Sequence, residues 1–270
     1  MIGQRCVQAQ IKSAMERKAL ARFIILVGDT GSGRKTLAKE MSKWLGVECI
    51  IVDKGVDAIR EVIEQSYKLS EEVVYVLDGD NMSQAAKSAL LKVTEEPPNK
   101  VRFVLTIRSL NQTLDTLTSR ACIFRMDNYT KQDIAAFAGV EDWRYENFCT
   151  NKYEVDLVKG YGVKEFTDFV QLAVDNIDIV SGSNAMKMGS KIAFTPSDDG
   201  YDMKIFLQAF RTVCMSRVQE SDDYRDKAKY LEWINVTTKK IADLSTSTLN
   251  KQSLFDMWLF NIRAVTYAND

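Results

Sequence analysis

The sequence predicts an α/β domain built on a parallel sheet, followed by mostly helical domains. Three observations lead to this class. Short apolar runs alternate with helical segments up to about residue 128, which is typical of a parallel sheet. No run of similar quality follows residue 130. The 270 residues contain only 13 Gly and 3 Pro, about half the usual share. So few turn formers argue against an all-β sandwich.

Five apolar runs in the first domain predict the strands of this sheet. Each is short and rich in Ile, Val, Leu or Phe, as expected of strands buried on both faces. The expected strands are 23–27, 49–52, 73–77, 102–107 and 122–125, and the helices between them are 8–21, 35–45, 56–67 and 83–95. Ser83 is the expected N-cap of the last helix, which Pro97 and Pro98 end. Strands joined through helices predict right-handed crossovers and a parallel arrangement.

The rest of the chain reads as amphipathic helices. The predicted helices are 133–139, 164–176, 204–218, 224–241 and 254–267, and 181–190 is a Gly/Ser/Asn-rich candidate linker. We therefore expect three domains: α/β at 1–128, a small helical domain at 129–180 and a helical domain at 181–270. The late aromatic residues at helical spacing are expected to pack rather than to stack on nucleic-acid bases. They are Trp233, Phe255, Trp258 and Phe260.

Composition excludes several classes of function. The 36 Lys and Arg residues against 37 Asp and Glu give a net charge of −1, so the chain is no bulk polycation. It has no His, which excludes Ser-His-Asp triads, Cys-His dyads and His-ligated metals. Five scattered Cys residues predict reduced thiols, no metal site and a cytoplasmic protein. The apolar run Phe23–Val27 is too short to span a membrane.

A glycine-rich turn between the first strand and its helix has the context of a phosphate-binding loop. Gly28, Gly31 and Gly33 would let backbone N–H groups converge on an anion at a helix N-terminus. A working loop continues with Lys and then Ser or Thr. Here Arg34 and Lys35 follow, and Thr36 comes one place late. Three alternatives stay open: a degenerate loop without hydrolysis, a one-residue slip that puts Lys35 and Thr36 into the functional positions, or a glycine-rich turn that binds no nucleotide.

The acidic segment after the third strand also departs from an ATPase pattern. Such an enzyme needs an Asp for magnesium and then a Glu to activate water. If Asp78 binds the metal, Gly79 stands in the place of the base. If the register shifts by one, Leu77 stands in the place of the metal ligand. Neither register supplies both groups, so the sequence predicts no ATP hydrolysis at this site.

Three segments carry a resemblance to a known family. The first, MSQAAKSALLKVTEEPP at 82–98, is similar without gaps to the M-T-x-A-A-x-N-A-L-L-K-x-L-E-E-P-P motif of clamp-loader AAA+ subunits, most closely the delta-prime subunits of bacterial DNA polymerase III. Segments 103–106 and 117–121 resemble the F-I-L-x-T and L-x-S-R-C motifs of this family, at the same spacing. The resemblance covers roughly residues 8–126. It implies an AAA+ domain of P-loop type with a five-stranded sheet, an all-α lid and an all-α collar.

The resemblance assigns one catalytic role. Ser119 and Arg120 match the S-R of the S-R-C motif, whose Arg reaches into the nucleotide site of a neighbouring subunit as an arginine finger. A guanidinium group suits this role because it offsets charge that spreads over a phosphoryl group in transfer. The alternative is an intramolecular salt bridge or a helix cap. The sensor positions of the family fall at Ile107-Arg108 and near Lys164 and do not carry the expected residues.

Two further features have a functional and a structural interpretation. Lys87 and Lys92 lie on the helix that borders the DNA chamber in clamp loaders, so they are DNA-facing candidates. A solvated helix face is the alternative. Glu95 and Glu96 could be taken for a catalytic carboxylate pair, but the resemblance implies a structural role for both.

The sequence thus predicts a clamp-loader subunit that does not itself turn over ATP. Its expected partners are other AAA+ subunits, a sliding clamp and primer-template DNA, without a membrane. It needs no cofactor, and whether its loop holds ATP or ADP without hydrolysis stays open. The alternatives are an active small AAA+ ATPase of replication and an interaction scaffold derived from the AAA+ fold.

Overall fold

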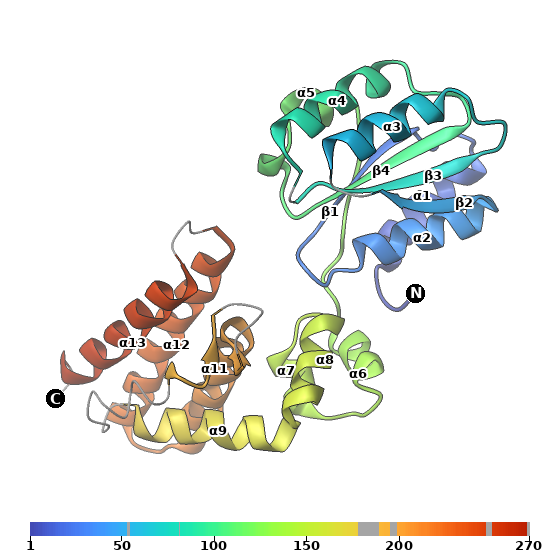
Figure 1. Cartoon of the computed structure of the whole chain (residues 1–270). Coiled ribbons are helices and arrows are strands. Elements are labelled where there is room, and N and C mark those ends of the chain that lie inside the picture. The colour runs from blue at the N-terminus through green and yellow to red at the C-terminus, as the bar shows by residue number, and fades with distance from the viewer. Residues whose placement is uncertain (53–54, 81, 178–188, 195–198, 247–249, 269–270) are drawn as a thin grey trace. The chain divides into compact units, whose positions relative to one another are not determined.

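The computed structural model describes residues 1–52, 55–80, 82–177, 189–194, 199–246 and 250–268. These residues form two compact units, which are described separately below. The first unit comprises residues 1–130 and the second comprises residues 131–270 (Figure 1).

The first unit is built on a five-stranded parallel sheet (Figure 1). Its strands follow one another along the chain as β1 (Phe23–Val27), β2 (Glu48–Val52), β3 (Val73–Asp78), β4 (Val101–Ile107) and β5 (Cys122–Arg125). In space their order is β2-β3-β4-β1-β5, so the first strand lies between the last two. Every residue of β1 is buried, as the apolar run in the sequence predicted for a strand covered on both faces.

The strand register brings several strand ends to one edge of the sheet. Val27 pairs with Ile107, and Asp78 pairs with Thr106. The backbone N–H of Gly28 continues the ladder by donating to the carbonyl oxygen of Ile107 at 3.1 Å. The loops that follow β1, β3 and β4 therefore meet at this carboxyl edge, which is where ligands bind in open α/β sheets.

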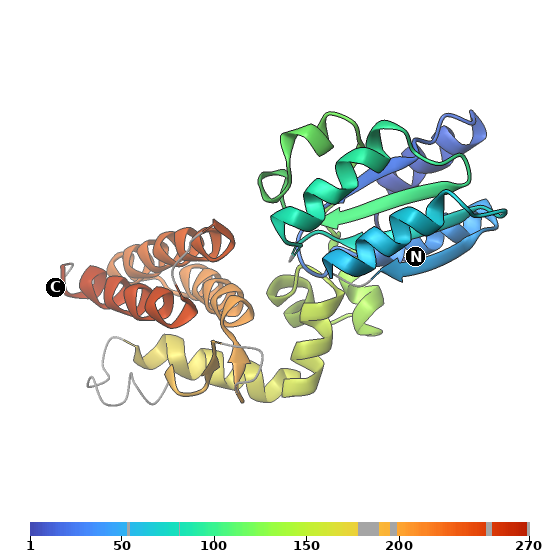
Figure 2. The same cartoon turned by 45° about the horizontal axis from the view of Figure 1, so that its top comes forward.

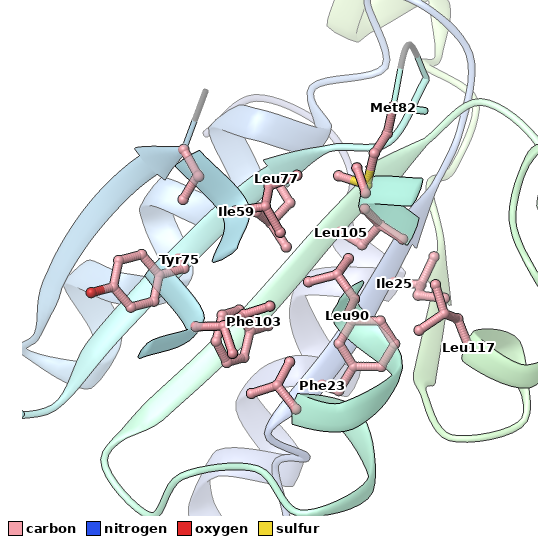
Figure 3. Packing of buried hydrophobic residues seen from close by; sticks show 14 of the residues in the cluster. Phe23, Ile25, Ile59, Tyr75, Leu77, Met82, Leu90, Phe103, Leu105 and Leu117 are labelled. Carbon is pink, nitrogen blue, oxygen red and sulfur yellow. The ribbon is translucent and has the colours of Figure 1, made fainter. Parts of the chain in front are cut away.

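Helices cover both faces of the sheet. On one face, α3 (Val56–Ser66), α4 (Gln84–Glu95) and α5 (Asp115–Thr118) pack onto Phe23, Ile25, Tyr75, Phe103 and Leu105 (Figure 3). On the other, α1 (Arg5–Glu16) and α2 (Arg34–Leu45) pack onto the alternate side chains of the same strands. A short 3-10 turn, η1 (Leu110–Gln112), lies between β4 and α5. Burial on both faces explains why the central strands β1, β3 and β4 are nearly continuous apolar runs.

Ser83 caps α4 as expected, because its side chain accepts a hydrogen bond from the backbone N–H of Ala86 at 3.2 Å. The helix ends at Glu95, shortly before Pro97 and Pro98, as the prolines predicted.

The second unit is mainly helical. Its helices are α6 (Lys131–Ala138), α7 (Trp143–Phe148), α8 (Lys152–Tyr161), α9 (Val163–Asn176), α11 (Met203–Glu220), α12 (Tyr224–Thr246) and α13 (Lys251–Ala268). The last three are adjacent helices, as both views show (Figures 1 and 2). Two two-residue strands, β6 (Ile192–Ala193) and β7 (Tyr201–Asp202), pair in parallel beside them. The sequence pattern did not predict this small ladder.

An aromatic cluster forms the core of the last three helices. Trp233 and Trp258 are completely buried, and their indole N–H groups donate to the hydroxyl groups of Thr266 and Thr237, at 3.2 and 3.0 Å. The two bonds run in opposite directions between α12 and α13. Each satisfies a buried indole donor, as a Trp in a core requires. Together they fix the register of the two helices.

The prediction that four late aromatic residues pack in the core holds for three of them. Phe255 is 1% exposed, like the two buried tryptophans, whereas Phe260 is 73% exposed. Helical periodicity gives the reason: Phe260 is two residues from Trp258 and two from Ile262, both fully buried, so it lies on the opposite face of α13.

The structure confirms the fold class and all five strands. The first helix starts at Arg5 rather than at residue 8 and ends at Glu16, five residues earlier than expected. The short helices α7 and α8 were not predicted. Residues 178–188, which include most of the expected linker, lie outside the described residues. The division of the helical part near residue 180 stays a prediction.

The cysteines provide a test of the packing. All five are free thiols; Cys6 is exposed, whereas Cys149 and Cys214 are buried. Burial raises the pKa of both buried thiols well above the ordinary value. Because the thiolate is the reactive form, we expect Ellman's reagent to label Cys6 at least about tenfold faster than either buried thiol in the native chain. In guanidinium chloride the difference in labelling rate between Cys6 and the buried thiols should vanish. Fast native labelling of Cys149 or Cys214 would contradict the packing.

Candidate functional site

The candidate site lies at the carboxyl edge of the sheet, on the loop between β1 and α2. Gly31 and Gly33 have φ angles of 83° and 88°, a region that disfavours residues with a side chain. A β-carbon at position 28 would lie 2.7 Å from the side chain of Met126, so glycine is required there as well. The loop ends at the N-terminus of α2, whose first residue is Arg34. This is the backbone arrangement that binds phosphate groups.

The two basic side chains after the loop are bonded to acidic groups of the same site. Arg34 donates to the carboxylate of Asp80 at 3.1 Å, and Lys35 donates to the carboxylate of Asp78 at 2.9 Å. Asp80 also accepts the backbone N–H of Arg108 at 2.6 Å. The side chains of Arg34 and Asp80 are only 11% and 13% exposed, so water screens their attraction weakly. The pair uses the Nη2 atom of Arg34, whose Nη1 atom is buried without a hydrogen-bond partner in the described part of the chain.

The position of a general base has no room for a side chain. A β-carbon at Gly79 would lie 2.6 Å from Cγ2 of Ile107 and 2.8 Å from Cδ1 of Leu105. Contacts this short require the strand residues to move. A glutamate at this position would therefore disturb the end of β4. Among the described residues, Asp78 is a carboxylate at the position of the metal ligand, whereas the next position, where the ATPase pattern has its base, is Gly79.

The slipped register of the loop also lacks a carboxylate at position 79. Lys35 could take the place of the phosphate-binding lysine, and Thr36 lies exposed in the first turn of α2. Its use would still leave Gly79 without a carboxylate. Among the described residues, no group of three or more His, Cys, Asp or Glu side chains is placed to hold a metal ion.

The N-terminal segment and the end of the first unit are hydrogen-bonded to the loop. The side chain of Gln4 donates to the carbonyl oxygens of Ser32 and Asp127, at 3.2 and 2.7 Å, and accepts the backbone N–H of Asp127 at 2.6 Å. The hydroxyl of Tyr129 donates to the same carbonyl of Ser32 at 2.9 Å. Gln4 is 2% exposed and has a φ of 56°, a conformation that non-glycine residues rarely adopt.

Sequence reasoning missed Gln4 and Tyr129. They lie 28 and 97 residues from Ser32 along the chain, and nothing in the local pattern links them to it. A glutamine with a left-handed backbone is visible only in the structure. These contacts hold the glycine loop against residues 127–129.

Arg120 lies at the opposite edge of the sheet from the loop. It comes two residues before β5, whose first residue pairs with Ile24 near the start of β1. The five residues of β1 separate the two edges, which at about 3.3 Å per residue is roughly 16 Å. Arg120 therefore cannot reach a phosphate held by its own loop. Any action of Arg120 on a nucleotide has to be on one that a second subunit holds.

The side chain of Arg120 makes two bonds within the chain. It donates to the carbonyl oxygen of Thr116 at 2.7 Å and to the carboxylate of Glu95 at 2.9 Å. The intramolecular salt bridge that the sequence left open as an alternative is thus present. Arg120 nevertheless keeps 35% of its side chain exposed. Ser119 is exposed, and its hydroxyl donates to the carbonyl oxygen of Thr116 at 3.1 Å.

The two DNA-facing candidates lie in different surroundings. Lys87 is 8% exposed, and its ammonium group donates to the carbonyl oxygen of Gln112. This corrects the expectation that it faces DNA, because the side chain turns inward to satisfy the turn before α5. Lys92 is exposed on α4, and its contact with DNA stays a prediction.

The chain is similar to known proteins over parts of its length. The model of a family described as "DNA polymerase III, delta subunit" matches residues 47–130. Over 73 residues the chain is 45% identical to the DNA polymerase III subunit delta′ of Escherichia coli, a match that covers 24% of this chain and 21% of that protein. Over 218 residues it is 24% identical to the DNA polymerase III subunit gamma of Buchnera aphidicola, a match that covers 67% of this chain and 59% of that protein.

A solved structure shares the fold. It is a DNA polymerase III gamma subunit-related protein from Thermotoga maritima, 16% identical, with a TM-score of 0.52 over 97% of this chain and 99% of that chain. The chain spans about half the length of the curated relatives that it matches over long segments.

The strand order and the glycine loop at the carboxyl edge agree with the α/β fold that the sequence predicted. The similarity to DNA polymerase III subunits agrees with the clamp-loader resemblance of the motifs in the sequence, and it covers parts of the chain. None of the helices in the described part is both long and apolar enough to cross a membrane.

Proposed function

We propose that the chain is a cytoplasmic clamp-loader subunit of DNA replication that does not hydrolyse ATP itself and that supplies Arg120 to the nucleotide site of a neighbouring AAA+ subunit. The assembly would open a sliding clamp and place it on primer-template DNA. The relatives named as DNA polymerase III subunits support this class of function. In this role the chain needs no nucleotide of its own.

One observation carries the non-hydrolysing role. The basic residues of the loop are bonded to Asp78 and Asp80, and the position of the general base is a glycine that is packed against Ile107. Among the described residues, both basic side chains of the site are thus paired with its carboxylates, and the position after Asp78 carries no carboxylate. An active ATPase needs phosphate-binding cations that are available and a positioned carboxylate.

The location of Arg120 supports its action in trans. It lies at the amino edge of the sheet, away from its own loop, with part of its side chain in solvent. A partly exposed guanidinium group at a domain edge is suited to contact phosphate on an adjacent subunit.

The isolated chain is expected to hydrolyse ATP no faster than a buffer blank, because neither loop register supplies a complete set of groups. A coupled assay at saturating Mg²⁺-ATP measures this. Turnover of about 1 per second or more, the ordinary enzyme range, would contradict the proposal. If that activity disappeared in Lys35→Ala, the slipped register and an active small ATPase would be the correct interpretation. Thr36→Ala is the matched second variant, because the slipped register needs its hydroxyl for magnesium.

A further inference from the structure

The contact between Glu95 and Arg120 joins two elements that are distant in the sequence. Glu95 is the last residue of α4, and Arg120 lies in the short segment between α5 and β5. The Nη2 atom of Arg120 donates to Oε1 of Glu95 at 2.9 Å, while Nη1 donates to the carbonyl oxygen of Thr116 at 2.7 Å. The two acceptors hold the two ends of the guanidinium fork.

Two anchors on different nitrogens fix the plane of the guanidinium group. The group has five N–H donors, and the two bonds use two of them. The remaining donors are available to a phosphate group. A side chain that is already fixed loses less conformational entropy when it engages its target than a freely rotating one. The same fixed geometry raises the efficiency of a group that acts only in the transition state.

Folding stability is a poor explanation for this pair. Glu95 is 56% exposed and Arg120 is 35% exposed, and ion pairs in water contribute little to stability. The substitution of Glu95 is therefore expected to leave the fold intact, so its effect on activity can be measured in a folded assembly.

We propose that Glu95 is a positioning residue for the arginine finger: its carboxylate holds Arg120 in the orientation in which it engages the phosphate of a neighbouring subunit. This inference rests on the proposed function, since it requires that Arg120 acts in trans. It also assigns different roles to the two adjacent glutamates. Glu96 contacts Tyr67 through its main-chain carbonyl, a contact that a side-chain substitution preserves.

The contact can be tested first in the isolated chain. Phenylglyoxal modifies accessible arginines, and mass spectrometry of the peptides gives the rate at Arg120. Glu95→Ala should raise this rate at least about threefold, because the guanidinium loses its carboxylate partner. Glu96→Ala, the matched control, should leave it at the wild-type value. Equal rates in wild type and Glu95→Ala would overturn the inference.

The decisive test is the ATPase activity of the assembly that contains the chain, its AAA+ partner subunits, the clamp and primer-template DNA. Glu95→Ala should lower kcat at least about threefold and leave KM for ATP within about twofold, because orientation acts on the transition state. Glu95→Gln, which keeps an oxygen acceptor, should recover part of the loss. Glu96→Ala should match wild type.

The outcomes separate the two proposals. If Arg120→Ala lowers kcat but Glu95→Ala does not, the positioning role of Glu95 is wrong, and the proposed action of Arg120 in trans is retained. If Glu95→Ala raises kcat, the pair restrains Arg120 and the inference is overturned. If Arg120→Ala has no effect in an intact assembly, the proposed function fails and the inference fails with it.

Discussion

Replacement of Arg120 by alanine is expected to lower the DNA- and clamp-stimulated ATPase rate of the assembly at least tenfold. The guanidinium offsets charge that develops on the phosphoryl group of a neighbour, and arginine fingers typically contribute about 10³–10⁵ to the rate. A tenfold loss is about 1.4 kcal/mol of barrier. The measurement is the steady-state rate at matched concentrations, with gel filtration to verify that the variant assembles.

Arg125→Ala is the control for charge. Arg125 is also exposed and lies on the same domain, but it is at the carboxyl end of β5, at the other edge of the sheet. This variant should keep the wild-type rate. A wild-type rate in Arg120→Ala with the assembly intact would contradict the arginine finger. The chain would then be an interaction scaffold that retained the AAA+ fold.

Trp258→Ala is expected to destabilise the helical unit by about 3–5 kcal/mol, the usual loss when a buried tryptophan is truncated. Trp258 is fully buried, and its ring centroid lies 5.0 Å from that of Phe210 and 5.3 Å from that of Phe255. Truncation would also leave the hydroxyl of Thr237 without the indole donor. Urea unfolding followed by far-UV circular dichroism measures the change.

Phe260→Ala is the matched control on the same helix. Phe260 is 73% exposed, and its truncation should change the free energy of unfolding of the isolated chain by less than about 0.5 kcal/mol. A similar loss in both variants, or a loss below about 1 kcal/mol in Trp258→Ala, would contradict the packing of α13.

Much of the fold was predictable because burial leaves a clear trace in the sequence. A parallel strand covered on both faces has to be largely apolar, so residues 23–27 and 73–77 stand out from their polar flanks. Short helices leave a weaker trace. Trp143–Phe148 is less than two turns long, so its helical period is hardly repeated. Phe260 shows a related problem: helical spacing alone does not tell which aromatic residue of a helix faces the core.

The candidate site was predictable only as far as local motifs reach. The glycine loop and the degenerate acidic segment are each contiguous, so their chemistry could be read directly. The contacts between the glycine loop and the acidic segment could not be predicted from the sequence. The pair Arg34–Asp80 spans 46 residues and Arg120–Glu95 spans 25, and only the folded sheet brings these residues together. Gly79 could be recognised as a missing base, but its close packing against Ile107 depends on the neighbouring strand.

The central claim is that this chain acts on the nucleotide of a neighbour and not on one of its own. A cryo-electron microscopy reconstruction of the assembly on primer-template DNA, with its clamp and a non-hydrolysable ATP analogue, tests it most directly. The account predicts the guanidinium of Arg120 within hydrogen-bonding distance of the γ-phosphate in an adjacent subunit, with the Arg34–Asp80 pair intact. An Mg²⁺-bound analogue in the loop at Gly28–Gly33, with Arg120 turned away from every nucleotide, would contradict it.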